Sequence, residues 1–410
     1  MFSKIRLIIV FVLFSHFASA QFLSLFGLGE KKVVPKNLMQ DRAVQIETTS
    51  AINNMYNSNF DAAEKEFKWL IVKYPQHPIG YFLLGLNEWW KIVPDPRQTR
   101  FDSKCEDYMD KAIDLADDIY DDDETNKEAA FFMACAYAFK GRLYAEREKW
   151  IQSAYAGKQA MKYLERCRGP QDLNPELLFG DGIYNYYSKW IHQNYPSLKP
   201  LLVFFKKGDK PKGINQLEEV SNNAFYTRME ARYFLVQIYG MEDQHQKAYN
   251  LSKMMHSLYP NNPFFHRYAA RTAFILSKMP EAEALSLELL NNIDAGKVGY
   301  EATAGRYAAY IIAYINDKYN DNKPKAKEYY QKSIDFALKN KAQESGYSLG
   351  SHLGLGKIAE DEKDYLTAAR HYKTVIDFAE KKSDTYDEAK KRILALKKKL
   401  QVEKKKMKEN

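Results

Sequence analysis

The sequence repeats one local pattern, in which an amphipathic helix ends at a proline-bounded turn. Residues 74–78 read Tyr-Pro-Gln-His-Pro and residues 259–263 read Tyr-Pro-Asn-Asn-Pro. Because proline cannot occupy a helix interior and restrains the residue before it, each segment predicts the end of a helix. Ala63 and Ala248 precede the first proline of each turn by 12 positions, and Ala282 follows Ala248 after 34 positions. A period of this length predicts an array of stacked helix pairs.

Small residues recur where the two helices of a pair would approach each other. They matter because two helices pack closely only where no large side chain separates them. In the first helices the small residue is followed three positions later by a second marker, as in Gly85 with Glu88, Val236 with Tyr239, Ala270 with Ala273, and Gly356 with Ala359. The second helices carry the series Ala63-Phe67-Leu70, Ala248-Ser252-Met255, Ala282-Ser286-Leu289, Ala326-Tyr330-Ser333 and Ala368-Tyr372-Val375.

With these positions, most of residues 41–386 resembles the tetratricopeptide-repeat (TPR) superfamily. Three residues depart from its pattern: Ser252 and Ser286 replace an aromatic residue, and Glu88 replaces a tyrosine. The resemblance implies an all-α fold, a right-handed α-solenoid of about six to seven antiparallel helix pairs. It also implies a scaffold that binds protein partners and is not an enzyme.

A second, more local resemblance covers the central region. A glycine- and aromatic-rich helix over residues 179–187 is followed by an apolar stretch that contains a proline and ends at residues 201–205. A basic Gly-Asp turn over residues 206–213 and a helix from Ile214 complete the order. This order is similar to the tetratricopeptide-repeat-39 family and its exported bacterial relatives. That group has no established catalytic residues, so the resemblance implies none here.

The first twenty residues have the features of a secretory signal. Lys4 and Arg6 precede an apolar core, and Ala18-Ser19-Ala20 forms a cleavage site. The core is shorter than the roughly 20 apolar residues of a membrane span, although a retained anchor is an alternative. We therefore expect an exported protein, in a periplasm or else secreted or associated with an outer membrane; a eukaryotic secretory lumen stays open. The expected parts are a signal peptide (1–20), a linker (21–40), the solenoid (41–386) and a basic helical tail (387–410).

The net charge of +8 comes from the C-terminal end. The chain has 61 basic and 53 acidic residues, and residues 390–410 hold 10 and 2 of them, which leaves 51 of each sign elsewhere. We therefore predict no nucleic-acid partner. The tail is either a solvated helix end or a contact for an anionic membrane or an acidic partner. The acidic residues 117–124 lack the pattern of a calcium-binding loop and are interpreted as a solvated loop.

The sequence offers no pattern for catalysis, a cofactor or a metal. His245, His256 and His266 are spaced too widely for one helical face, and no cysteine pair has zinc spacing. Nucleophile-elbow and phosphate-loop motifs are absent, and Gly354 and Gly356 fit packing positions better than a dinucleotide loop. The cysteines are either three separate buried thiols, or one pair, best Cys135 with Cys167, and a free Cys105.

The first helices of a TPR-like array line its concave surface, where partners bind. Positions three before and one after the small residue, with their neighbours, should lie on that surface. Aromatic residues at these positions either bind a partner or pack between repeats. Two arginines four positions apart repel each other on a bare helix, so they predict an anionic partner. The predicted partner-binding residues are Phe82, Trp89, Tyr233, Gln237, Arg267, Arg271, Phe274 and Lys357.

Two functions follow. The first is a non-catalytic scaffold for protein–protein interactions, in the assembly or function of a cell-envelope or secretion complex. The alternative is a ligand-binding accessory of a transporter, in which aromatic residues enclose a small amphipathic molecule. The aromatic residues of that alternative are Trp89, Tyr184, Tyr186 and Tyr187.

Overall fold

The computed structural model describes residues 37–167, 175–194 and 207–409. The expected signal peptide, residues 1–20, and most of the expected linker lie outside the described residues. So does the apolar stretch over residues 201–205.

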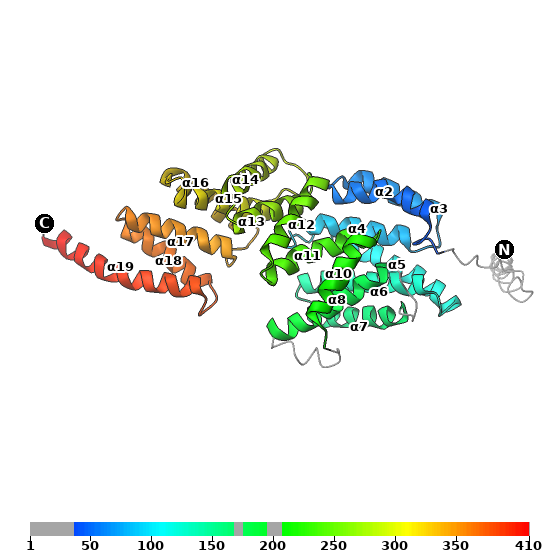
Figure 1. The fold of residues 1–410 in the computed structure, drawn as a ribbon. Coiled ribbons are helices and arrows are strands. Elements are labelled where there is room, and N and C mark those ends of the chain that lie inside the picture. The colour runs from blue at the N-terminus through cyan, green and yellow to red at the C-terminus, as the bar shows by residue number, and fades with distance from the viewer. Residues whose placement is uncertain (1–36, 168–174, 195–206, 410) are drawn as a thin grey trace, which may run out of the picture. The chain divides into compact units, whose positions relative to one another are not determined.

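The helices of this chain come in consecutive pairs, in which we call the first the A helix and the second the B helix. Figure 1 follows them from α2 to α19. The eight pairs of the described residues are α2 (Arg42–Tyr56) with α3 (Phe60–Lys73), α4 (Ile79–Ile92) with α5 (Asp102–Asp122), α6 (Lys127–Glu146) with α7 (Trp150–Cys167), α8 (Pro175–Asn194) with α10 (Lys210–Asn223), α11 (Arg228–Met241) with α12 (His245–Leu258), α13 (Pro263–Ile275) with α14 (Met279–Asp294), α15 (Ala302–Lys318) with α16 (Lys323–Lys339), and α17 (Gly346–Asp361) with α18 (Tyr365–Phe378). The last helix is α19 (Asp384–Glu409).

Each helix packs mainly on its neighbours in the sequence. The predicted all-α array of helix pairs is confirmed, with eight pairs in the described part of the chain instead of six to seven. None of the described helices combines the length and the apolar character that crossing a membrane requires.

Five of the pairs share one turn between the A and the B helix. Its middle residue has a positive φ of 54–64°. The amide of the next residue donates a hydrogen bond of 2.8–2.9 Å to the carbonyl five positions earlier. This geometry closes the A helix and reverses the chain within three residues. The middle residues are Ser58, Glu148, Asp243, Ser277 and Lys363, none of which is glycine.

Glycines in the A helices provide the close approach that the sequence predicted. A Cβ added at Gly356 of α17 would lie 2.5 Å from Cε1 of Tyr372 in α18. A Cβ at Gly354 would lie equally close to the ring of Tyr330 in α16. Both tyrosines are buried, so their rings could not easily move aside. The two glycines therefore serve helix packing.

Glycines also allow the close packing of α8 and α10 in the central region. A Cβ at Gly213 of α10 would lie 2.6 Å from the amide nitrogen of Tyr186 in α8, and Gly182 faces Gly213 from α8. The two backbones can approach this closely only without side chains between them. Asp209 caps α10 by accepting a hydrogen bond of 3.0 Å from the amide of Lys212. The helix thus begins within the basic turn, ahead of the predicted start.

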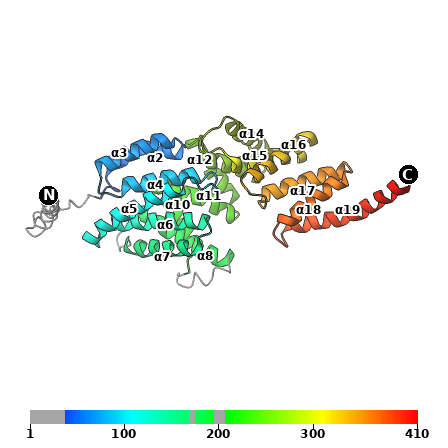
Figure 2. The same cartoon turned by 180° about the vertical axis from the view of Figure 1, so that it is seen from behind.

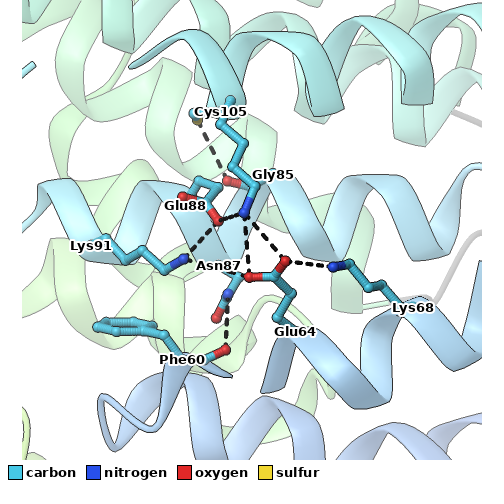
Figure 3. Close-up of polar contacts among 9 residues, drawn as sticks. Phe60, Glu64, Lys68, Gly85, Asn87, Glu88, Lys91 and Cys105 are labelled. Atoms are coloured by element: carbon cyan, nitrogen blue, oxygen red, sulfur yellow. Dashed lines mark hydrogen bonds and ion pairs between the residues drawn. The ribbon is translucent and has the colours of Figure 1, made fainter. Parts of the chain in front are cut away.

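Glu88 departs from the TPR pattern, and its contacts show why a carboxylate is stable there. It is 1% exposed on α4, and its Oε1 lies 2.7 Å from Nζ of Lys91 and 3.1 Å from Nζ of Lys104 on α5. Lys104 also binds Glu64 of α3 at 3.2 Å, and Glu64 binds Lys68 at 2.8 Å (Figure 3). The network of charges joins three consecutive helices where the family has a tyrosine ring.

The chain also makes contacts between pairs that are far apart in the sequence. The turn between α12 and α13 lies against the end of α2, where Nδ2 of Asn262 donates to the carbonyl of Tyr56 at 2.7 Å. The amide of Asn261 donates to Oδ1 of Asn57 at 3.0 Å. In the views of Figures 1 and 2, α11 and α12 accordingly lie beside α2 and α4. One hydrophobic core therefore runs from the first pair to Phe265 of α13.

The acidic segment before residue 123 differs from its prediction. Residues 117–122 belong to the last turns of α5, so their interpretation as a loop is wrong. Ile119 and Tyr120 are buried between the exposed carboxylates and hold this turn on the core. Only residues 123–126 connect α5 to α6.

The C-terminal helix α19 packs on α17 and α18. Its Ala389 and Leu396 are fully buried. Ion pairs also join α19 to α17: Glu388 lies 2.7 Å from Lys357, and Arg392 lies 3.1 Å from Glu360. The first half of the basic segment is thus attached to the last helix pair.

Candidate functional site

In the last three pairs, the A helix α15 contacts both of the A helices beside it, α13 and α17. We call the side chains that meet there the Arg-Tyr face. Pro263 and the side chain of Asn262 start α13, because Oδ1 of Asn262 accepts hydrogen bonds from the amides of Phe264 and Phe265 at 3.0 and 3.2 Å. The residues of the face are Arg267, Arg271 and Phe274 of α13, Arg306, Tyr307, Tyr310 and Tyr314 of α15, and Tyr347 of α17.

Arg267 is the deepest residue of the face on α13. It is 6% exposed, and its Nη1 donates a hydrogen bond of 2.8 Å to the carbonyl of Pro94. Its guanidinium lies 5.4 Å from the ring centre of Tyr307 and 5.3 Å from that of Phe264. Backbone and aromatic rings thus hold this charge, without a carboxylate.

Arg306 carries the least compensated charge of the face. It is 7% exposed and lies 5.5 Å from the ring centre of Tyr307. Its Nε and Nη1 are buried and have no hydrogen-bond partner among the described residues. Burial lowers the pKa of Arg306, and the positive charges of Arg267 and Arg97 act in the same direction, while Tyr307 and the carboxylate of Asp95 oppose them. Leaving donors of a charged group unpaired costs more than leaving neutral ones unpaired.

Arg271 lies one turn beyond Arg267 on α13. Its guanidinium is 5.6 Å from the ring centre of Tyr268, and its buried Nε has no hydrogen-bond partner within the described part of the chain. Burial acts to lower its pKa, but the phenols of Tyr347, Tyr268 and Tyr307 outweigh burial and raise it. Arg271 therefore stays charged.

The three arginines have no acidic partner in contact. Over residues 37–167, 175–194 and 207–409, no carboxylate oxygen lies within 4 Å of Arg267, Arg271 or Arg306. Glu344, the nearby acid on the α17 side, is paired with Arg97. An incoming carboxylate or phosphate would accept hydrogen bonds from the unpartnered nitrogens, which is the charge-assisted pairing that guanidinium favours.

Aromatic rings continue the face along the three helices. Tyr347 lies 4.4 Å from Tyr307 and 4.9 Å from Tyr310 between ring centres. Phe274 meets Tyr314 edge to face at 5.2 Å. All five rings are half-buried, so each has an edge or a face open to solvent. Tyrosine and arginine are the side chains that most often anchor protein interfaces.

The structure brings together three of the predicted partner-binding residues, although Arg267 is as buried as the residues rejected below and only Arg271 and Phe274 are half-buried. Lys357 lies on α17, but its Nζ is engaged with Glu388 of α19 at 2.7 Å. Gln237 lies on α11 and donates to the carbonyl of Tyr233 at 3.0 Å. These two residues are not part of the Arg-Tyr face.

The prediction of a solvent-exposed surface is wrong for Phe82, Trp89 and Tyr233. They are 8%, 2% and 4% exposed. Phe82 and Trp89 pack edge to face on Phe139 of α6, with ring centres 6.0 and 5.9 Å apart. Tyr233 packs on Trp90 at 5.5 Å. The reason is that α6 covers Phe82 and Trp89, while α11 returns onto α4 and buries Tyr233 against Trp90.

Sequence reasoning missed Arg306 and Tyr310, although a signal for them exists. The rule that selects Arg267 and Arg271 around Ala270 takes the positions three before and one after a small residue. Ala309 is a fully buried small residue of α15. Applied to it, the same rule selects Arg306 and Tyr310.

The aromatic residues of the ligand-binding alternative do not form one enclosure. Tyr186 is fully buried, and its hydroxyl donates to Glu242 at 2.8 Å. Trp89 is separated from the Tyr187 region by the guanidinium of Arg142, which lies 4.7 Å from Trp89 and 4.8 Å from Phe234. A cavity between α4, α6 and α11 measures about 20 Å³. Sites for small molecules usually measure several hundred Å³.

Comparison with known proteins supports only a broad likeness. No protein-family model and no curated protein matches the chain. The crystal structure of yeast Tom70 superposes with a TM-score of 0.39 and 14% identity, covering 96% of this chain and 82% of that chain. The P58(IPK) TPR domain gives a TM-score of 0.24 and 12% identity, covering 87% of this chain and 98% of that chain.

Proposed function

We propose that this chain is a non-catalytic scaffold that binds an acidic segment of a protein partner across α13, α15 and α17. The observation that carries the proposal is the convergence of Arg267, Arg271 and Arg306 without a carboxylate in contact. Buried donors of this kind represent unused binding energy, because a bound anion would restore the hydrogen bonds that burial has removed.

A protein segment fits the face better than an isolated anion does. The rings of Phe274, Tyr310, Tyr314 and Tyr347 extend beyond the arginines along the same helices. An extended segment with an acidic residue next to apolar ones would engage both parts. TPR-like arrays use such long surfaces of adjacent helices for partners. The ligand-binding alternative has no comparable support, because the cavity described above has room for little more than a water molecule.

We also propose that the scaffold acts outside the cytoplasm, in the assembly or function of a cell-envelope or secretion complex. The support is the sequence of residues 1–20, with its basic start, apolar core and Ala-Ser-Ala site. The lysines that follow residue 396 would add a contact with an anionic membrane surface or a second acidic partner.

The test is crosslinking in cells with the tagged full chain, followed by purification and identification of partners by mass spectrometry. Arg271→Gln and Arg306→Gln should each weaken recovery of the partner, and the double variant should reduce it at least about tenfold. Arg370→Gln is the matched control, because Arg370 is exposed on the B helix α18.

The thermal stability of Arg306→Gln separates binding from folding. Removing a buried charge without a partner should leave the melting temperature unchanged or raise it. A variant that is as stable as the wild type and loses the partner supports the proposal. Stable variants that retain the partner would remove the Arg-Tyr face as its binding site, and a chain that captures no protein would count against the scaffold itself.

A further inference from the structure

Two histidines and a glutamate converge where three consecutive helices meet. His256 of α12 stacks on His266 of α13, with ring centres 4.2 Å apart and an angle of 21° between the rings. Oε2 of Glu288 in α14 lies 3.9 Å from Nε2 of His266. One nitrogen of each ring and one carboxylate oxygen all lie within 4.8 Å of one another. We propose that His256, His266 and Glu288 form a binding site for a divalent transition-metal ion, with zinc as the reference ion.

The types of side chain suit this ion. Neutral imidazole and carboxylate are common zinc ligands, and two histidines with one glutamate carry a net charge of −1 toward a divalent cation. His266 is fully buried, whereas the side chain of Glu288 is 56% exposed. The site is therefore closed on the protein side and open to solvent on the other. Three ligands leave the fourth tetrahedral position for water.

Two tautomers of His266 compete for the contacts around its ring. Nδ1 lies 3.2 Å from the hydroxyl of Tyr300, which donates to the carbonyl of Pro260 at 3.2 Å. Nε2 lies 3.1 Å from the carbonyl of Leu285. These three contacts need three hydrogens, but a neutral imidazole and a phenol supply only two. Burial lowers the pKa of His266 to about 3, so the third hydrogen is not available at neutral pH.

A metal ion on Nε2 would select one of these tautomers, in exchange for the contact of Nε2 with the carbonyl of Leu285. Nδ1–H then donates to Tyr300, Tyr300 donates to Pro260, and the lone pair of Nε2 faces the ion. Metal-bound histidines usually donate their other ring N–H to an oxygen in this way, which fixes both the tautomer and the ring orientation. The chain from His266 to Pro260 therefore has the form of an outer shell for a metal ligand.

His256 also has a ring nitrogen without a hydrogen-bond partner within the described part of the chain. Its Nδ1 is buried and has no hydrogen-bond partner among the described residues. Burial lowers the pKa of His256, so the ring is neutral and can act as a ligand. In a tetrahedral zinc site the ligand atoms are about 3.3 Å apart, given zinc–ligand distances of roughly 2 Å. Glu288 and the half-buried His256 can make the required movement, while Tyr300 holds His266 in place.

The sequence predicted no metal site because its histidines do not share one helical face. His256 and His266 are ten positions apart on different helices, and the turn at residues 259–263 folds them together. Another pair, His352 and His371, has Nδ1 atoms 3.0 Å apart. No third ligand accompanies that pair in the part of the chain that the structure describes. It therefore serves as an internal comparison.

The test is calorimetric titration of ZnCl₂ into the full chain after dialysis against a chelator. We expect one strong site per chain. Because loss of even an outer-shell partner weakens metal binding 10–100-fold, His256→Ala and Glu288→Gln should each weaken it at least about 100-fold. His245→Ala, exposed on the same helix α12, and His371→Ala should leave the affinity within about twofold.

Glu288→Gln keeps the shape of an exposed side chain, so circular dichroism should show an unchanged fold. A bound Co²⁺ ion in place of zinc should give the visible absorption of a four-coordinate site, and this absorption should be lost in His256→Ala. Absence of stoichiometric zinc binding by the wild type would overturn the proposal. So would binding that survives both ligand substitutions, or that disappears with His371→Ala instead.

Discussion

The indole Nε1 of Trp90 donates a hydrogen bond of 2.6 Å to Oε1 of Glu230, which joins α4 to α11 across 140 positions of sequence. The hydroxyl of Tyr56 on α2 reaches the same oxygen at 3.2 Å. Glu230 is only 2% exposed. One buried carboxyl group therefore connects the A helices of the first two pairs to the A helix of the fifth. This connection explains why the early pairs offer no open surface and why the candidate site lies further along the chain.

Replacing Glu230 should show how much this connection stabilises the fold. Glu230→Leu leaves two buried donors, Trp90 Nε1 and Tyr56 Oη, without an acceptor, at a cost of about 1–3 kcal/mol each. We expect a loss of about 2–4 kcal/mol in the free energy of unfolding by urea. Glu230→Gln keeps an oxygen at the same place and should stay within about 1 kcal/mol of the wild type. Equal losses in the two variants would contradict this role of the carboxyl oxygen.

Glu230 should also make the stability of the folded state depend on pH. Burial raises the pKa of Glu230 above its ordinary value of 4.5, although Trp90, Arg142 and Tyr56 oppose the shift. The folded state therefore binds the proton more tightly than the unfolded state does. The stabilising contribution is present below pH 4.5 and is lost as the pH rises through the raised pKa.

Glu230→Gln cannot titrate and supplies the comparison. The free energy of unfolding of the wild type, minus that of the variant, should fall as the pH rises from about 4.5 through the raised pKa. Urea unfolding at several pH values measures this difference. A difference that grows with pH would mean that Glu230 is better stabilised as an anion than its burial indicates.

Two helical glycines should respond in opposite ways to the same substitution. Gly356→Ala places a Cβ against the buried ring of Tyr372 and should cost about 1–3 kcal/mol, as overpacking does. Gly157 lies inside α7 with no atom within 4 Å of an added Cβ. Gly157→Ala should therefore stabilise the chain by about 0.5–1 kcal/mol through helix propensity. Thermal melting of both variants checks the expectation, which would be wrong if both shifted in one direction.

The cysteines should react as three hindered thiols. In the structure Cys105, Cys135 and Cys167 are thiols, and the first and last of them are buried. Burial raises the pKa of Cys105 to about 12 and that of Cys135 well above its ordinary value of 9.0. Because the thiolate is the reactive form, a thiol reagent at neutral pH should react slowly with the native protein.

After unfolding without a reductant, the same reagent should titrate three thiols per chain. A single thiol would instead reveal a disulfide, for which the sequence favoured Cys135 with Cys167. The native protein before unfolding serves as the control for accessibility.

Much of the fold could be predicted because its signals are local. The proline turns at residues 74–78 and 259–263 and the small residues such as Gly356 act within one helix pair. The turns between A and B helices were harder to predict, because residues such as Glu148 and Lys363 adopt a positive φ without being glycine. Such residues adopt this conformation at a cost of about 1 kcal/mol, which the packing of the helix pair offsets.

The candidate site could be predicted only in part. Helical spacing selects Arg267 and Arg271 and, around Ala309, also Arg306. It cannot tell whether an A-helix position stays open, because this depends on contacts with distant pairs. Trp89 and Phe274 lie four positions after Gly85 and Ala270, yet α6 and Arg142 cover Trp89, whereas Phe274 stays half-buried. Helical periodicity also cannot predict the approach of His256 to His266, because the two rings come from different helices.

The sequence by itself determined that the chain forms helix pairs, that two turns between pairs lie at residues 74–78 and 259–263, and which small residues let the helices pack. These properties depend on side chains within one or two helical turns or within adjacent helices. Only the tertiary structure decided which surfaces remain available. The contact of Trp90 with Glu230 closes the early A helices, whereas the last three pairs keep half-buried tyrosines and arginines that no described carboxylate contacts. The physical reason is that burial is set by the sum of contacts from segments far apart in the chain, and no local pattern records that sum.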